Sequence, residues 1–150
     1  LEAREINVTL PDNVKPGYAI IVQGKVESTS GIDSHNLTTN VIYDELNRCG
    51  FDADDIFYFN FDTEQIGVDA TPSKTDILDA ITTWARDKIN VSPAPLYIIL
   101  AGHGEVDKFP IFPDTLESVD LGQAITDLQN SFTGTAIGQN VVLVIRSHLH

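Results

Sequence analysis

The sequence predicts an α/β domain built on a doubly wound, mostly parallel sheet with helices on both faces. Two observations lead to this prediction. Four short apolar runs alternate with segments whose apolar residues recur at the 3.6-residue period of a helix. The runs are also apolar on both faces, as strands are when helices cover both sides of a parallel sheet. Alternation of this kind forms right-handed βαβ units and an open sheet.

The four expected strands are short and rich in β-branched and aromatic residues. They lie at residues 18–22, 56–59, 96–101 and 141–145. Gly17 and Gly24 bound the first of them, and an Asp-rich turn at 52–55 precedes the second. Such runs, bounded by turn residues, are typical of strands.

The segments between the strands carry three amphipathic helical patterns. The apolar faces are formed by Leu37, Val41, Ile42, Leu46 and Cys49 in the first, by Ile77, Leu78, Ile81, Trp84, Ala85 and Ile89 in the second, and by Leu121, Ala124, Ile125 and Leu128 in the third. Gly50 suits the end of the first helix. Thr71 or Ser73 is the expected cap of the second, and Ser118 or Asp120 that of the third.

Charge and hydropathy exclude several classes of partner. The chain has 22 acidic and 9 basic residues and a net charge of −13, which repels phosphate backbones and anionic membrane surfaces. No apolar run approaches the roughly 18 residues of a membrane span. We therefore expect no nucleic-acid partner and no membrane partner.

The ends of the chain differ in character from its middle. Residues 1–16 are polar, contain two prolines, and are expected to form a linker or an edge strand around residues 6–10. Residues 17–145 form the expected α/β domain, and residues 146–150 are interpreted as a cloning scar or partial tag. The absence of methionine, even at position 1, indicates a processed product or an excised piece.

The tripeptide Gly102-His103-Gly104 is the strongest candidate for chemistry. It follows an expected strand, and ligands of open α/β sheets bind beyond the carboxyl ends of the strands. Flanking glycines let the chain turn sharply and expose the imidazole, which can act as a general base or acid near neutral pH. The alternative is an ordinary loop histidine whose ring caps local structure. His35, expected at the entry to the first helix, and His148 are weaker candidates.

The segment from Leu96 to Gly104 resembles the strand and His-Gly motif of the clan that unites legumain, gingipains, clostripain and caspases. The resemblance covers about residues 17–145 and includes the first helix, Gly50-Phe51, the Trp84 helix and the stretch 109–128. It is closest to bacterial legumain-like, hemoglobinase-type domains. It implies a caspase-like fold, incomplete at the C-terminus because the family adds two more strands.

The resemblance also implies the roles of individual residues. His103 would be the catalytic histidine of a His/Cys dyad, and the N–H of Gly104 would form part of the oxyanion hole. Gly24, Lys25 and Glu105 would contact a peptide or protein substrate, with no metal and no cofactor. The cysteine that the family places after the last strand is missing here, since Arg146, Ser147 and His148 follow it. The chain is therefore expected to be inactive as given.

Cys49 is the one cysteine, so no intramolecular disulfide can form. It is expected to be a buried structural residue, because it ends the apolar face of a helix and lies at the amino edge of the sheet. A helix C-terminus also disfavours a thiolate. It is therefore not expected to replace the missing nucleophile.

Two other functions remain open at this stage. The chain can be a pseudoenzyme that uses a caspase-like fold for binding, or a flavodoxin- or receiver-like signalling module. The acidic runs at 52–55 and 62–69 lack the pattern of an EF-hand and fit turns and caps better than calcium ligands. The last strand would expose an apolar edge, which favours homo-oligomers. The compartment stays open, with an extracellular or cell-surface bacterial location compatible with the resemblance.

Overall fold

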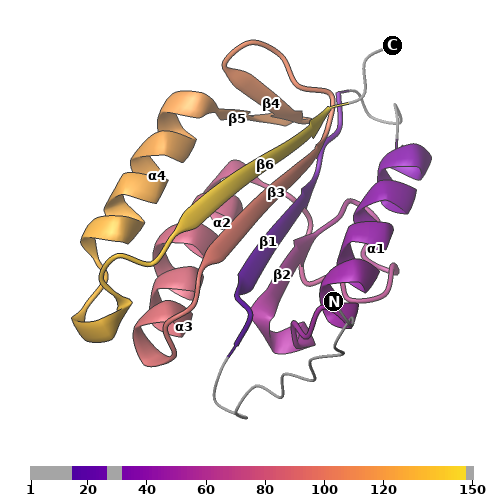
Figure 1. Cartoon of the computed structure of the whole chain (residues 1–150). Helices are drawn as coiled ribbons and strands as arrows, with labels where there is room; N and C mark the ends of the chain where they lie inside the picture. Colours follow the sequence, from indigo (N-terminus) through magenta and orange to yellow (C-terminus); the bar gives the residue numbers. More distant parts are fainter. Residues whose placement is uncertain (1–14, 27–31, 148–150) are drawn as a thin grey trace, which may run out of the picture.

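The chain forms an α/β fold with a mostly parallel sheet, as the sequence predicts (Figure 1). The coordinates are a computed structural model that describes residues 15–26 and 32–147. The edge strand expected around residues 6–10 and the weak candidate His148 lie outside the described residues.

The main sheet has four strands in the order β2-β1-β3-β6. Its members are β1 (Tyr18–Gln23), β2 (Ile56–Phe59), β3 (Leu96–Gly102) and β6 (Val141–Ser147). Each neighbouring pair runs parallel, so all four strands end at one common edge. All four expected strands are therefore confirmed.

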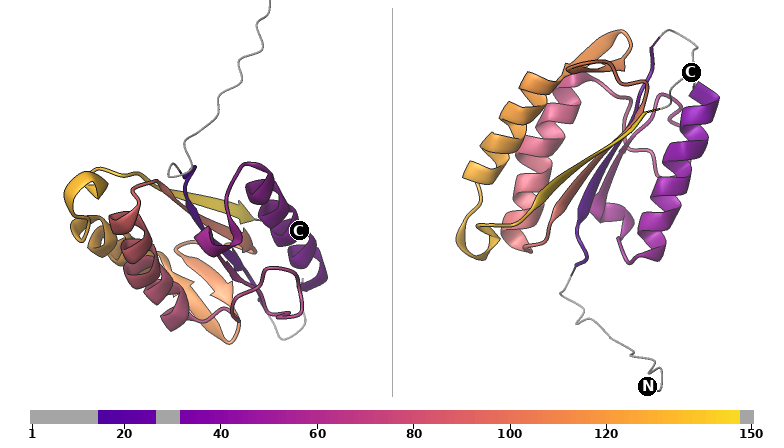
Figure 2. Two further views of the ribbon diagram at one scale, coloured as in Figure 1. Left: turned by 90° about the horizontal axis from the view of Figure 1, so that it is seen from below. Right: turned by 45° about the horizontal axis from the view of Figure 1, so that its top comes forward.

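Helices cover both faces of this sheet, as expected for a doubly wound fold. Helix α1 (Ile32–Arg48) lies on one face, whereas α2 (Lys74–Asp79), α3 (Arg86–Val91) and α4 (Ser118–Asn130) lie on the other (Figures 1 and 2). The π-helical segment η2 (Ala80–Ala85) joins α2 to α3 into one continuous rod. Short 3₁₀ turns, η1 (Ala53–Asp55) and η3 (Gly134–Ala136), precede β2 and β6.

Strand β1 shows how the sheet separates two cores. Its side chains alternate between the faces: Tyr18, Ile20 and Val22 join the larger core under α2–α4. Ala19 and Ile21 join the smaller core under α1. All six residues of β1 are buried, which explains why this strand is apolar on both faces.

The apolar faces predicted for the second and third helices are confirmed. In the rod from α2 to α3, Ile77, Ile81 and Ile89 are fully buried at the four- and eight-residue steps of a helix. Ser73 is the N-cap of α2, since its hydroxyl accepts the N–H of Asp76 at 3.1 Å. In contrast, neither cap predicted for α4 is found: Glu117 holds the N-cap position and Ser118 is already helical.

The apolar face predicted for α1 is partly wrong. Leu37 and Val41 are 69% and 54% exposed, while Thr39 and Tyr43 are buried. The buried face is shifted because the hydroxyl of Thr39 is hydrogen-bonded inside the fold, which an apolar pattern cannot show. The end of the helix is as predicted.

That end is a Schellman motif. Gly50 has a φ of +96° and donates to Asn47, and the N–H of Phe51 donates to Leu46 at 3.0 Å. Cys49 stands just before this glycine and is exposed. The expectation of a buried Cys49 is therefore wrong, because α1 has its last helical residue at Arg48 and Cys49 belongs to the turn that Gly50 closes.

A β-hairpin that the sequence analysis did not predict follows β3. Strands β4 (Lys108–Ile111) and β5 (Asp114–Glu117) pair antiparallel. Pro110 and Pro113 argue against strands in a sequence, but a two-stranded ribbon leaves outer edges where no ladder N–H is needed. The hairpin lies above the carboxyl ends of the strands (Figure 1).

The two edges of the main sheet differ in their protection. Along β2, the segment around Asp69 and Ala70 pairs with the outer edge: Asn60 N–H donates to Ala70 at 3.0 Å, and Asp69 N–H donates to Tyr58 at 2.8 Å. Among the described residues, no segment pairs with the outer edge of β6. Its residues Val142 and Ile145 are 38% and 56% exposed.

The carboxyl group of Asp69 makes the protection of β2 depend on pH. It accepts the N–H of Tyr58 at 2.9 Å, and partial desolvation of the carboxyl raises its pKa above the usual value, although the residue as a whole is exposed. A pKa that is higher in the folded state gives stability that is present below the unfolded pKa and is lost as pH rises through the folded one.

We therefore expect Asp69→Asn to raise Tm modestly at about pH 7, because asparagine still accepts the hydrogen bond and carries no charge. The gain should vanish at about pH 3, where aspartate is protonated in both states. Thermal unfolding of both proteins at the two pH values tests this. Asp79→Asn is the control, since Asp79 ends α2 and lies away from the edge of β2, and an equal gain from it would contradict the explanation.

Candidate functional site

His103 lies where the sequence predicts it, at the carboxyl edge of the sheet immediately after β3. Strand β3 pairs in parallel with β6 from Leu96–Val141 to Gly102–Ser147. The residue before His103 is therefore directly opposite the end of β6. The side chain of His103 is half-buried.

Two glycines bring the end of β1 against the end of β3. Gly24 donates its N–H to the carbonyl of Ala101 at 2.7 Å. A Cβ added at Gly102 would stand 2.8 Å from the Cα of Gly24 and 3.3 Å from the ring of Phe109. Gly102 does not have a positive φ, so it is required here for close approach and not, as the sequence analysis assumed, for a sharp turn.

The loop after His103 is a tight turn that starts the hairpin. The N–H of Glu105 donates to Lys108 at 3.0 Å, and Lys108 donates back at 3.3 Å. Asp107, at the turn, has a φ of +61°, and its carbonyl accepts the N–H of Ser118 at the start of α4. The loop is thereby fixed to both the hairpin and the helix.

An apolar cavity of about 340 Å³ opens beside this loop. Gly104 and Glu105 are among its lining residues, and the others come from β3, β6, α4, the hairpin and the turn before it. The wall side chains are Leu100, Phe109, Leu116, Leu121, Ile125, Leu143 and Ile145. The cavity can accept an apolar group next to the backbone that follows His103.

Lys25 lines a different hollow. Its backbone joins the hairpin, since its N–H donates to Pro110 at 3.0 Å and its carbonyl accepts the N–H of Phe112 at 2.8 Å. Its ammonium lies 4.7 Å from the ring centre of Phe61, a cation–π distance. Phe61 and Phe112 line the open groove of about 550 Å³ that holds Lys25. Lys25 and Glu105 therefore do not share one pocket.

A buried polar network lies under α1, next to the ends of β1 and β2, and was missed by the sequence analysis. The hydroxyl of Tyr58 donates to Thr39 or Asn40, both at 2.6 Å, and accepts the amide N–H of Asn60 at 2.9 Å. Gln23 accepts the N–H of Phe61 at 2.7 Å. The signal was available, because Gln23 and Asn60 are polar residues at the ends of apolar strands.

This network fixes strand ends and offers little reactivity. Burial raises the pKa of the Tyr58 hydroxyl, although its hydrogen bonds to Thr39 and Asn60 oppose the change. These contacts join β1 or β2 to α1 or to the loop after β2. The network thus positions the loops at this edge.

The acidic runs are engaged in local structure. Asp62 accepts the N–H of Glu64 at 3.0 Å and the side chain of Gln65 at 2.8 Å, and Asp69 holds β2 as described above. Among the side chains that the structure describes, no three of His, Cys, Asp or Glu gather as metal ligands would. No described helix is long and apolar enough to cross a membrane.

No family model and no curated protein matches this chain. The function therefore has to be argued from the geometry at the carboxyl edge of the sheet.

Proposed function

We propose that this chain carries the histidine of a His/Cys peptidase site of the caspase and legumain type, on a caspase-like fold. The parallel pairing of β3 with β6 supports this most strongly. In the family that the sequence resembles, the strand beside the histidine strand presents the cysteine. Here β6 ends opposite Gly102, so a nucleophile that followed it would be next to His103.

The chemistry of the proposed site is nucleophilic acyl transfer. His103 would take the proton of the thiol, and the thiolate would attack the carbonyl carbon of the scissile peptide bond. The N–H of Gly104 would donate to the oxygen that becomes negative, and the C–N bond would break as His103 returns the proton to the leaving amine. Lys25 and Glu105 are proposed to contact the peptide from two separate hollows, whereas Gly24, also expected there, is buried against Gly102 and Phe109.

As given, the chain is proposed to lack peptidase activity. Cys49, the sole cysteine, is exposed and precedes β2, so it stands at the amino edge of the sheet, away from His103. Neither an imidazole nor an unactivated hydroxyl attacks an amide at a useful rate. In this state the fold would bind peptides without cleaving them.

A receiver-like signalling role has less support. Phosphoacceptor and nucleotide sites in such folds also use the carboxyl edge of the sheet. Here β1 ends in Gln23 and is followed by Gly24 and Lys25, which supply no carboxylate. The fully buried amide of Gln23 binds the backbone of Phe61 instead.

The proposal is tested by placing a cysteine at position 148, directly after β6, in a Cys49→Ser background. We expect the thiol of the His148→Cys variant to have a pKa at least about 1 unit below the usual value of about 8.5, because the imidazolium of His103 would stabilise the thiolate. The pKa is measured from the pH dependence of alkylation by iodoacetamide. Adding His103→Ala should return it toward the usual value.

The wild-type chain supplies a matched control. Its one thiol, Cys49, is at the opposite edge, so His103→Ala should leave the alkylation profile of Cys49 unchanged. If the thiol at position 148 titrates identically with and without His103, the proposed dyad is wrong.

A further inference from the structure

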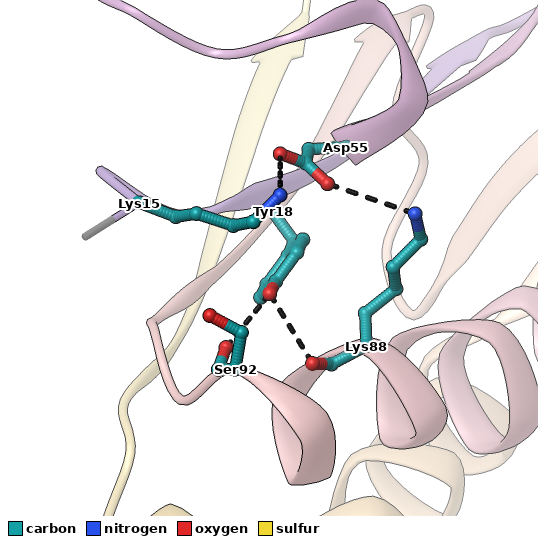
Figure 3. Close-up of polar contacts among 5 residues, drawn as sticks. All are labelled: Lys15, Tyr18, Asp55, Lys88 and Ser92. Carbon is teal, nitrogen blue, oxygen red and sulfur yellow. Dashed lines mark hydrogen bonds and ion pairs between the residues drawn. The ribbon is translucent and has the colours of Figure 1, made fainter. Parts of the chain in front are cut away.

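A buried carboxylate at the amino edge of the sheet is shared by two lysines (Figure 3). Asp55, at the end of η1, has a side chain that is 2% exposed. Its Oδ2 accepts a hydrogen bond from Lys15 Nζ at 2.8 Å. Its Oδ1 lies 3.6 Å from Lys88 Nζ and has no hydrogen-bond partner among the described residues.

The three residues come from three separate parts of the fold. Lys15 precedes β1, Asp55 precedes β2, and Lys88 lies in α3. The cluster therefore joins the segment that enters β1, residues 15–17, to both the sheet and the helical layer. It is at the edge opposite His103, away from the proposed peptidase site.

The backbone of Lys88 is fixed while its amine has a choice of contacts. The hydroxyl of Tyr18 donates to the carbonyl of Ser92 at 2.7 Å or to that of Lys88 at 3.2 Å. The amine of Lys88 lies 5.9 Å from the ring centre of Trp84, and its side chain is 33% exposed. A lysine side chain is long and flexible, so a change of rotamer can close the remaining distance to Asp55.

The buried carboxylate of Asp55 needs at least one lysine amine close to it at all times. A buried carboxylate left without a partner is strongly destabilising. The hydrogen bond to Asp55 also raises the pKa of Lys15, which keeps that amine charged. Lys15 is the close partner of Asp55 in this structure, and Lys88 is near enough to replace it.

We propose that Asp55 is a shared counter-ion that lets the segment entering β1 detach reversibly. Lys15 holds this segment against the amino edge of the sheet through Asp55. When the segment leaves, Lys88 moves onto the carboxylate, so no unpaired charge remains buried. The entry to β1 is thereby a strap that can open without unfolding the domain.

Stability measurements on three variants test the sharing. Lys15→Gln and Lys88→Gln should each raise the unfolding equilibrium constant by less than about 10-fold, since one lysine remains. The double variant should raise it by about 100-fold or more, beyond the product of the two single effects. Additive effects, or a Lys15→Gln variant as unstable as the double one, would overturn the proposal.

A third substitution keeps the test valid if the double variant folds poorly. Adding Asp55→Asn removes the buried charge and should restore most of the lost stability. No recovery would mean that the lysines act through packing, which contradicts the proposal.

Two local readouts follow the movement itself. Trp84 is the single tryptophan, so its fluorescence reports on the nearby amine of Lys88. Lys15→Gln should change this emission, and Lys15→Gln with Asp55→Asn should not. Identical emission from both would exclude the transfer of Lys88.

Hydrogen exchange at the N–H of Tyr18 reports on the strap, since this group bonds to Pro95 at 2.8 Å directly after the entry. Lys88→Gln should slow this exchange several-fold although it lowers global stability, because opening would then leave Asp55 unpaired. Faster or unchanged exchange in Lys88→Gln would refute the reversible strap.

Discussion

Replacing Gly102 by alanine is expected to destabilise the protein by about 3 kcal/mol, at the upper end of the usual cost of overpacking. The new Cβ would stand 2.8 Å from the Cα of Gly24 and 3.2 Å from its N atom. Both are backbone atoms of Gly24, directly after β1, so they cannot move aside as a flexible side chain can. Thermal unfolding should show Tm lower by roughly 5–10 °C.

Gly122 is the matched control for this substitution. It lies inside α4, and a Cβ built on it meets no atom within 4 Å. Gly122→Ala should therefore stabilise the protein by about 0.5–1 kcal/mol, because alanine is the better helix former. A Gly102→Ala variant that unfolds at the wild-type temperature would contradict the close packing of the two strand ends.

Replacing Val144 by lysine is expected to suppress self-association through the open edge of β6. The proposal behind this is that the wild-type chain forms concentration-dependent oligomers, because a strand edge without a partner can pair with another chain. Val144 and Leu143, which point to opposite faces, are 36% and 40% exposed. A lysine on such an edge strand opposes pairing with another chain, and its charged end stays in water because the position is exposed.

Sedimentation velocity over a range of concentrations measures the effect. Val91→Lys is the control, since Val91 is 86% exposed at the end of α3 and the change in net charge is the same. Only Val144→Lys should shift the chain to monomers. A wild-type chain that sediments as a monomer at every concentration would disprove the role of this edge.

The parallel sheet could be predicted because its residues are buried on both faces. Strand β3 shows this well: six of its seven residues are buried, with only Tyr97 half-buried, so the run reads as continuous hydrophobicity. The rod that contains Ile77 and Ile81 was predicted for the same reason, since an apolar stripe faces a sheet. Where apolar burial decides the structure, the amino-acid pattern reports it.

The prediction of the fold failed where polar contacts or the special backbone of proline determine the local structure. Helix α1 buries Thr39 through hydrogen bonds, so an apolar pattern placed its inner face at Leu37 and Val41. The hairpin was missed because the prolines at 110 and 113 outweigh its short apolar alternation.

The candidate site was predicted in position but not in detail. His103 at the carboxyl edge follows from the order of strands and helices alone. The separation of Lys25 from Glu105 depends on the hairpin, which binds the backbone of Lys25 and turns at Glu105. Because the hairpin was not predicted, the separation of these two residues could not be predicted either.

The contact between Gly24, Gly102 and Phe109 also limits how far the histidine can travel. The stretch 103–107 is short, and its two ends are held, at Gly102 by tight packing and at Lys108 by the ladder of the hairpin. The imidazole can therefore be reoriented only by rotation about its own side-chain bonds. A ligand of this ring therefore has to approach a loop that is already in place. Its binding costs little conformational entropy of the loop.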